Sequence, residues 1–208
     1  MTDTVVYPIP DHFSEAHVTP ERYHTLYRQS LDDPDTFWSE QAQLLDWHSP
    51  WSAVSETDVA KGAARWFVDA KLNVSVNCID RHLPKRAHDT AIIWEGDDPD
   101  DSQSFTYQEL KIQVCRFANA LRAQGIGKGD RVCIYMPMIP EAAFAMLACA
   151  RIGAIHSVVF GGFSPEALKD RINDATCSMV ITADEGVRGG KTVPLKRNVD
   201  AALAQVDC

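Results

Sequence analysis

The chain has 208 residues and a mass of 23.1 kDa, which allows one large domain or two small ones and a core that needs no disulfide or metal. Hydrophobic residues make up 45% and charged residues 24%, proportions typical of globular proteins that exclude wholesale disorder. Twenty Lys and Arg oppose 29 Asp and Glu, a formal net charge of −9. This acidic balance argues against a nucleic-acid partner, although a few local cations can still hold a small anion.

Cysteine usage and hydropathy indicate where the protein works. The six cysteines form no Cys-x-x-Cys pair, and four of them lie in apolar or helical runs, where a free thiol behaves as a small buried hydrophobe. The longest uninterrupted apolar run, 142–150, is too short to span a bilayer. The sequence has no early apolar block of the kind that indicates a secretory signal. We therefore expect a reduced, cytoplasmic protein without a membrane partner.

A change of composition near residue 85 divides the chain into segments 1–84 and 85–208. The first segment carries four of the five tryptophans and little regular periodicity. Thr19-Pro20-Glu21 predicts the start of one helix and Pro34-Asp35-Thr36 the start of another, because proline fits the first helical turn. We expect helical and irregular pieces packed on a larger body, with the aromatic side chains as packing anchors.

The second segment opens with a short apolar run, Ala91–Trp94, that ends in the acidic loop 95–101. Consecutive acids beside Gly and Pro are typical of a solvated turn, and a metal site is the alternative. Thr106-x-x-Glu109 is a capping box in front of a helix, whose apolar stripe runs to Leu121.

The run Val132–Met136 is apolar without alternation, which is typical of a strand buried on both faces of a parallel sheet. Ile155–Phe160 and Met179–Thr182 are predicted as the next two strands. Helical sequence separates them: Glu141–Ile152 lies between the first two, and another helix begins at Ser164. Strand, helix, strand, helix, strand with short links predicts an α/β fold with a right-handed parallel βαβ layer.

Two of the carboxyl ends of these strands, where such sheets bind ligands, are unusual. Phe160-Gly161-Gly162 follows one strand, and its glycines allow a flat group or another backbone to approach closely; a tight turn capped by Ser164 is an equal alternative. Arg188-Gly189-Gly190-Lys191 follows the next strand. Its two cations and exposed backbone N–H groups suit a phosphate, with a solvated basic turn as the alternative.

Other motifs fail. Gly186, Gly190, Lys191 and Thr192 fall one residue short of the Walker A spacing, and Pro194 stands where the P-loop helix would begin. The chain also lacks a complete dinucleotide fingerprint, a Gly-x-Ser-x-Gly elbow and a His-Glu-x-x-His pair. Taken alone, the residues predict an α/β module with a phosphate-binding edge and assign no reaction.

Four segments together resemble a known family. Residues 135–164, read from Tyr135-Met136-Pro137 to the glycines after Phe160, match it most closely, and residues 23–38, 77–82 and 91–97 are similar to it as well. The family is the AMP-forming acetyl-CoA synthetases (acetate–CoA ligases) of the adenylate-forming superfamily, and the similarity runs from about residue 20 to 200. The resemblance implies that segment 85–208 is the first part of the AMP-binding domain.

The family joins acetate to CoA in two steps: acetate and ATP, with Mg²⁺, give acetyl-AMP and pyrophosphate, and the CoA thiol then displaces AMP. The resemblance implies that Arg188, Gly189, Gly190 and Lys191 contact the nucleotide end of CoA. It implies that Phe160, Gly161 and Gly162 lie beside the adenine. The family commonly has a second arginine at the position of Lys191, and lysine keeps the charge but loses the bidentate fork.

The family's ATP-phosphate loop, Thr-Ser-Gly-Ser/Thr-Thr-Gly-Lys-Pro-Lys-Gly, does not occur in the 208 residues. We therefore expect an inactive N-terminal fragment of a synthetase that supplies scaffold and part of the CoA site, without catalytic or metal-binding residues. A non-catalytic CoA or nucleotide-binding module and a propionyl-CoA synthetase fragment are the alternatives. A sheet cut after Thr182 exposes an edge, so we also expect self-association.

Overall fold

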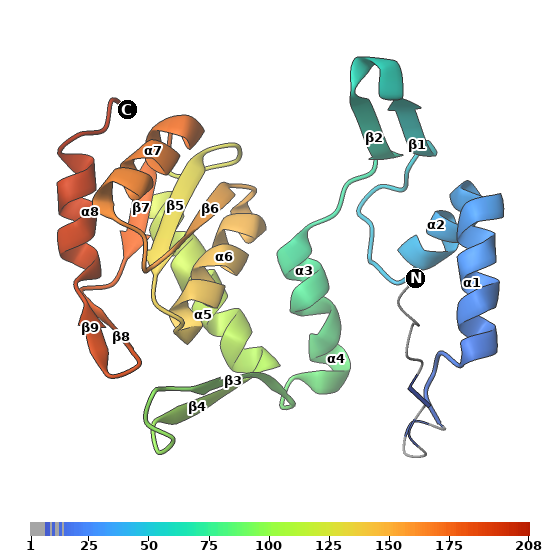
Figure 1. Ribbon diagram of the computed structural model, residues 1–208, viewed down its shortest axis with the longest axis horizontal. Helices are drawn as coiled ribbons and strands as arrows, with labels where there is room; N and C mark the ends of the chain where they lie inside the picture. Colours follow the sequence, from blue (N-terminus) through green and yellow to red (C-terminus); the bar gives the residue numbers. More distant parts are fainter. Residues whose placement is uncertain (1–6, 9, 11–12, 14) are drawn as a thin grey trace, which may run out of the picture. The chain divides into compact units, whose positions relative to one another are not determined.

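The computed structural model describes residues 7–8, 10, 13 and 15–208. It forms two compact units, one that runs to Lys71 and one from Leu72 to Cys208 (Figure 1). The change of composition at residue 85 therefore lies inside the second unit. No helix in the described part of the chain has the length and apolar character of a membrane span.

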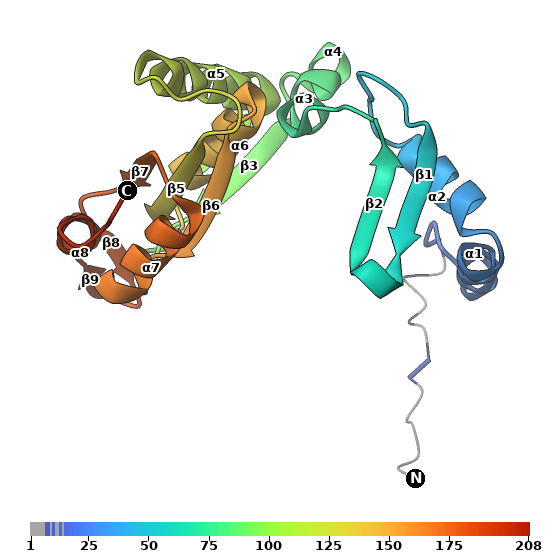
Figure 2. The ribbon, with the colours of Figure 1, turned by 90° about the horizontal axis from the view of Figure 1, so that it is seen from above.

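The described part of the first unit contains two helices and an antiparallel hairpin, which Figure 2 shows side by side: α1 (Pro20–Asp32), α2 (Pro34–Ala42), β1 (Ala53–Asp58), the short 3-10 turn η2 (Val59–Lys61) and β2 (Ala63–Val68). Both predicted helix starts are confirmed. The Thr19 hydroxyl and the Asp33 carboxylate accept hydrogen bonds from the first turns of α1 and α2, and each helix has proline in its first turn. The sequence does not predict the hairpin, since its first strand is largely polar.

The aromatic side chains of the first unit are only partly packing anchors. Trp47, Trp51 and Phe67 form a cluster with ring centroids 5.2–5.3 Å apart. Trp66 lies outside that cluster and is 56% exposed. The expectation therefore holds for Trp47 and Trp51 and fails for Trp66, and Trp38, 44% exposed, also lies outside the cluster.

The second unit carries the parallel sheet. Its elements are α3 (Val74–Cys78), the 3-10 turn η3 (Asp80–His82), α4 (Leu83–Arg86), β3 (Thr90–Glu95), β4 (Ser102–Thr106), α5 (Tyr107–Ala123), β5 (Arg131–Met136), α6 (Pro140–Ile152), β6 (Ile155–Phe160), α7 (Pro165–Ala175), β7 (Met179–Thr182), β8 (Gly186–Arg188), β9 (Lys191–Val193) and α8 (Leu195–Leu203).

The predicted βαβαβ series is confirmed: β6, β5 and β7 form a parallel sheet in that order, with β5 at the centre. Helices cover both faces, α5 and α6 on one and α7 and α8 on the other (Figure 2). Side chains of β5 alternate between these faces: Val132 and Ile134 enter the core under α5 and α6, and Cys133 and Tyr135 enter the core under α7 and α8. The central strand is buried on both faces because it has a helical layer on each.

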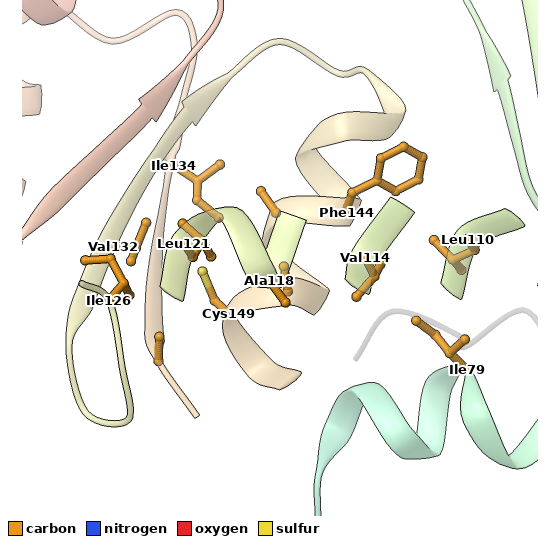
Figure 3. Packing of buried hydrophobic residues seen from close by; sticks show 13 residues of the cluster. Ile79, Leu110, Val114, Ala118, Leu121, Ile126, Val132, Ile134, Phe144 and Cys149 are labelled. Atoms are coloured by element: carbon orange, nitrogen blue, oxygen red, sulfur yellow. The ribbon is translucent and has the colours of Figure 1, made fainter. Parts of the chain in front are cut away.

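Figure 3 shows the core on the α5 and α6 side, to which Ile79, Val114, Ile134 and Phe144 contribute. The predicted capping box is present: the Thr106 hydroxyl accepts from the Glu109 N–H, and the Glu109 carboxylate accepts from the Thr106 N–H. It starts α5 at the position that directs the apolar stripe of this helix into the core.

Residues 72–84 belong to this unit because they are bonded to α5 and α6. The Asn73 side chain donates to the carbonyls of Ala150 and Arg151, each at 3.1 Å. Asp80 forms ion pairs with Lys111 on α5 and with Arg151 on α6. Burial opposes the charge of Asp80, but the hydrogen bonds and positive charges of its two partners outweigh burial and lower its pKa.

The cysteines of this unit behave largely as the small hydrophobes that the sequence predicts. Cys133, Cys149 and Cys177 are buried, and all six thiols are free. Burial raises the pKa of Cys133 to about 12 and that of Cys149 to about 11, so both remain protonated at neutral pH.

Candidate functional site

The three parallel strands β5, β6 and β7 have their carboxyl ends at the same end of the sheet, and both unusual segments follow them (Figure 1). The structure brings these segments into contact. The guanidinium carbon of Arg188 lies 4.9 Å from the centroid of the Phe160 ring, within the range of a cation–π interaction. Phe160 keeps 49% of its surface exposed, so the ring remains accessible beside the cation. We treat this pair as the centre of the candidate site.

The segment Arg188–Lys191 is the turn of a hairpin between β8 and β9, where the sequence indicated a loop. Arg188 pairs directly with Lys191. Gly189 and Gly190 between them have φ values of 57° and 71°, the left-handed conformation that a two-residue type I′ turn requires at both positions. The turn alone thus explains the two glycines.

The pairing also places two cations opposite each other. Directly opposed like charges destabilise an antiparallel pair unless an anion balances them. In the described part of the chain, neither Arg188 nor Lys191 has an ion-pair partner. The hairpin is therefore suited to hold an anion such as a phosphate, which relieves that repulsion.

One expectation about this turn is wrong: its backbone N–H groups are not all open. The Gly190 N–H donates to Asp97 Oδ2 at 3.1 Å. Asp97 belongs to the acidic loop 95–101, so this loop contacts the basic turn and is more than a solvated turn. The described residues contain no group of three or more His, Cys, Asp or Glu side chains that could hold a metal ion, and we derive no metal chemistry from the loop.

Close contacts explain the glycines after β6. A Cβ on Gly162 would lie 2.6 Å from the Phe160 ring, and one on Gly161 would lie 3.2 Å from the Met136 carbonyl oxygen. The approaching groups are therefore the protein's own ring and the end of β5. The Ser164 hydroxyl caps α7 as the alternative interpretation proposed. Both explanations hold together, and Phe160 keeps its position because Gly162 has no side chain.

Two positioning residues of this loop were missed from the sequence. The fully buried Tyr135 hydroxyl donates toward the carbonyls of Gly161 and Phe163, at 3.0 and 2.8 Å. It accepts a hydrogen bond from the Asn198 side chain on α8 at 3.2 Å. The one sequence signal is a tyrosine within a buried aliphatic strand, because a buried hydroxyl needs a partner.

The arrangement as a whole is suited to bind and orient a ligand. Phe160 and Phe163 offer aromatic faces, and a second cation, Arg171, lies 5.3 Å from the Phe163 ring centroid. An aromatic face next to two cations and a glycine turn matches a planar base attached to a phosphorylated sugar.

Comparison with known proteins assigns the chain that carries this site to a family. The family model of the AMP-binding enzymes matches residues 79–207. The chain belongs to the AMP-binding enzyme family. A second model, for the acetyl-coenzyme A synthetase N-terminus, matches residues 23–78, so the two models together cover most of the chain. Both matches confirm the resemblance that the sequence motifs carry.

Curated relatives of this AMP-binding enzyme chain agree with the models. Acetyl-coenzyme A synthetase 2 of Pseudomonas putida is 70% identical over 189 residues, 91% of this chain and 29% of that protein. Acetyl-coenzyme A synthetase of Alkalilimnicola ehrlichii is 63% identical over 98% of this chain and 32% of its own length. Acetyl-coenzyme A synthetase 2 of Pseudomonas aeruginosa is 59% identical over the whole chain and 32% of its own length. The chain thus spans about a third of the length of these relatives.

Proposed function

We propose that this sequence forms the amino-terminal part of an acetate–CoA ligase that makes acetyl-CoA from acetate, ATP and CoA. In the first half-reaction, an acetate oxygen attacks the α-phosphorus of ATP, supplied with Mg²⁺, and pyrophosphate leaves. In the second, the CoA thiol loses its proton and attacks the acetyl carbonyl carbon, and AMP leaves. Relatives named acetyl-coenzyme A synthetase, at 59–70% identity over nearly the whole chain, support this proposal.

The contribution of this part is one end of the CoA site. The observation that supports this assignment is the contact between Arg188 and the exposed Phe160 ring at the carboxyl end of β6. We propose that the adenine of CoA lies beside Phe160, Gly161 and Gly162. The phosphorylated ribose then meets Arg188 and Lys191 at the Gly189-Gly190 turn, whose opposed cations an anion stabilises.

The alternatives receive less support. A propionyl-CoA synthetase and a non-catalytic nucleotide-binding module are both compatible with the α/β layer, but the names of the relatives favour acetate and an enzyme. We also propose a reducing, cytoplasmic setting, which the six free thiols support.

The test is Arg188→Ala in a synthetase of the relatives' length that carries this sequence. We expect the KM for CoA to rise about tenfold, because a charge-assisted contact to a phosphate is worth about 1.5–3 kcal/mol and exposure reduces that value. Acetyl-AMP formation, followed as pyrophosphate release without CoA, should stay close to wild type. With dephospho-CoA the variant and the wild type should differ much less.

Arg197→Ala is the matched control, since Arg197 is an exposed arginine on α8. It should leave the KM for CoA unchanged. Loss of acetyl-AMP formation in Arg188→Ala with an unaltered dependence on CoA would contradict the assignment and indicate a structural turn.

We further propose that the 208-residue chain self-associates through its sheet. In the part of the chain that the structure describes, β6 and β7 each pair only with β5, so both are edges, and β6 carries the exposed side chains of Ile155 and Val158. Light scattering should give a mass that rises with concentration. Val158→Lys should shift it toward the monomer, because a charge on an edge strand opposes pairing. A wild-type monomer across a wide concentration range would contradict the proposal.

A further inference from the structure

The acidic loop 95–101 meets the basic turn of the β8–β9 hairpin, two segments that lie side by side in Figure 1. Five of its seven residues are acidic. One of them, Asp97, accepts the Gly190 N–H at 3.1 Å across 93 positions of sequence. The loop thus brings a carboxylate to the turn whose two cations we assign to a phosphate.

The loop is held in place by contacts that leave Asp97 directed at the turn. The loop joins β3 to β4, which pair antiparallel as a hairpin. Trp94 Nε1 in β3 donates to the Met138 carbonyl at 2.6 Å, which ties this β3–β4 hairpin to the segment that follows β5. Within the loop, the Gly96 N–H donates to the Asp101 carbonyl at 2.8 Å. The Asp98 carboxylate accepts the Asp100 N–H at 3.0 Å. Asp98 is therefore engaged inside the loop, whereas Asp97 bonds outside it.

The Asp97 carboxylate makes the kind of contact that a phosphate oxygen makes. It is an anion, it accepts a backbone N–H from a glycine turn, and the residues on either side of that turn are Arg188 and Lys191. Such N–H groups and cations are the usual partners of phosphate oxygens. A carboxylate in this position both occupies a donor and lowers the positive potential that an incoming phosphate meets.

We propose that Asp97 is an internal competitor for the phosphate of CoA: its carboxylate occupies the Gly190 N–H in the free protein, and the phosphate displaces it. The inference rests on the proposed function, since it concerns the same turn. It makes Asp97 a determinant of affinity for the phosphorylated ribose, which neither the acidic loop nor the basic turn indicates when considered alone.

The test is Asp97→Asn in the synthetase that carries this sequence, with CoA and dephospho-CoA as the probes. Asparagine keeps the size of the side chain and an oxygen that accepts the Gly190 N–H, so the variant removes the charge and preserves the hydrogen bond. We expect the affinity for CoA, measured by calorimetry at low salt, to rise about two- to fivefold, the range of exposed charge pairs. The affinity for dephospho-CoA should stay unchanged, and the gain with CoA should shrink at high salt.

Asp100→Asn is the matched control, because it removes the same charge from the same loop at a residue whose N–H, rather than its carboxylate, forms the described hydrogen bond. It should change the affinity for CoA much less than Asp97→Asn does. If Asp100→Asn raises the affinity for CoA as much as Asp97→Asn does, the net charge of the loop determines that affinity, and the proposed competition at the Gly190 N–H is wrong.

Arg188→Ala, measured beside these variants, separates the two proposals. A loss of CoA affinity in Arg188→Ala, together with an unchanged or weaker affinity in Asp97→Asn, overturns the competition and leaves the proposed CoA site in place. Equal binding of CoA and dephospho-CoA by the wild type, with no effect of Arg188→Ala, overturns both. A gain in Asp97→Asn with CoA alone supports both.

Discussion

The 208-residue chain, mixed with acetate, ATP and Mg²⁺, is expected to release no pyrophosphate above the rate of a protein-free blank. Forming acetyl-AMP requires donors and cations placed around the phosphates, where charge develops in the transition state. The Ser/Thr/Gly-rich loop that supplies them in acetyl-CoA synthetases does not occur in the sequence. The cations at Arg188 and Lys191 are assigned to the CoA end and cannot replace it.

This experiment needs protein free of the host's own synthetase. A synthetase of the relatives' length, purified in the same way, is the positive control. Pyrophosphate release that follows the 208-residue chain through two different chromatography columns would contradict the expectation.

Leu195→Ala is expected to lower the free energy of unfolding by about 2–5 kcal/mol, the usual cost of truncating a fully buried leucine. Leu195 is 1% exposed and belongs to the core under α7 and α8. Its two methyl groups would lie 3.3 and 3.4 Å from a Cβ added to Gly161 and to Gly186, so the side chain packs against both glycines. The substitution therefore leaves a cavity between the loop after β6 and the start of β8, and a loss of this size is a large share of a typical domain's stability.

Leu203→Ala is the control for this prediction, since Leu203 lies on the same helix and is 43% exposed. Urea unfolding followed by circular dichroism should show a much smaller loss for it. Equal losses for the two variants would contradict the prediction, because alanine has the higher helix propensity and the loss would then not come from the buried packing of Leu195.

The parallel sheet could be predicted because its signals are local. β5, β6 and β7 are rich in apolar and β-branched residues, and proline or a capping side chain begins each of the helices between them. The hairpins β1–β2 and β8–β9 could not be predicted in this way. β1 is largely polar, β8 and β9 have only three residues each, and every one of these strands is defined by its pairing with its partner strand. The Gly189-Gly190 pair is a hairpin signal in hindsight, but phosphate-binding loops use the same residues.

The candidate site shows the same division between local and distant information. Phe160 and Arg188 each stand out in the sequence, yet their contact depends on how the β8–β9 hairpin returns to the carboxyl end of β6. Asp97 and Asn198 gave no signal, because they bond to Gly190 and Tyr135 across 93 and 63 positions of sequence. Sequence patterns indicated the residues that we propose for binding, and the fold added Tyr135 and Asn198, which position the loop after β6, and Asp97, which we propose as a competitor.

The central place of β5 in its sheet has a consequence for the order of synthesis. β5 is made before both of its neighbours, because β6 begins at Ile155 and β7 at Met179, and α8, which helps to close the second face, begins only at Leu195. A growing chain therefore presents an apolar strand with two unpaired edges until β6 has been made, and with one unpaired edge until β7 ends at Thr182. Parallel pairing also has to bridge these distances before it yields any contact. The interval before β7 and α8 are made is thus when the nascent unit exposes the most strand edge and apolar surface to aggregation.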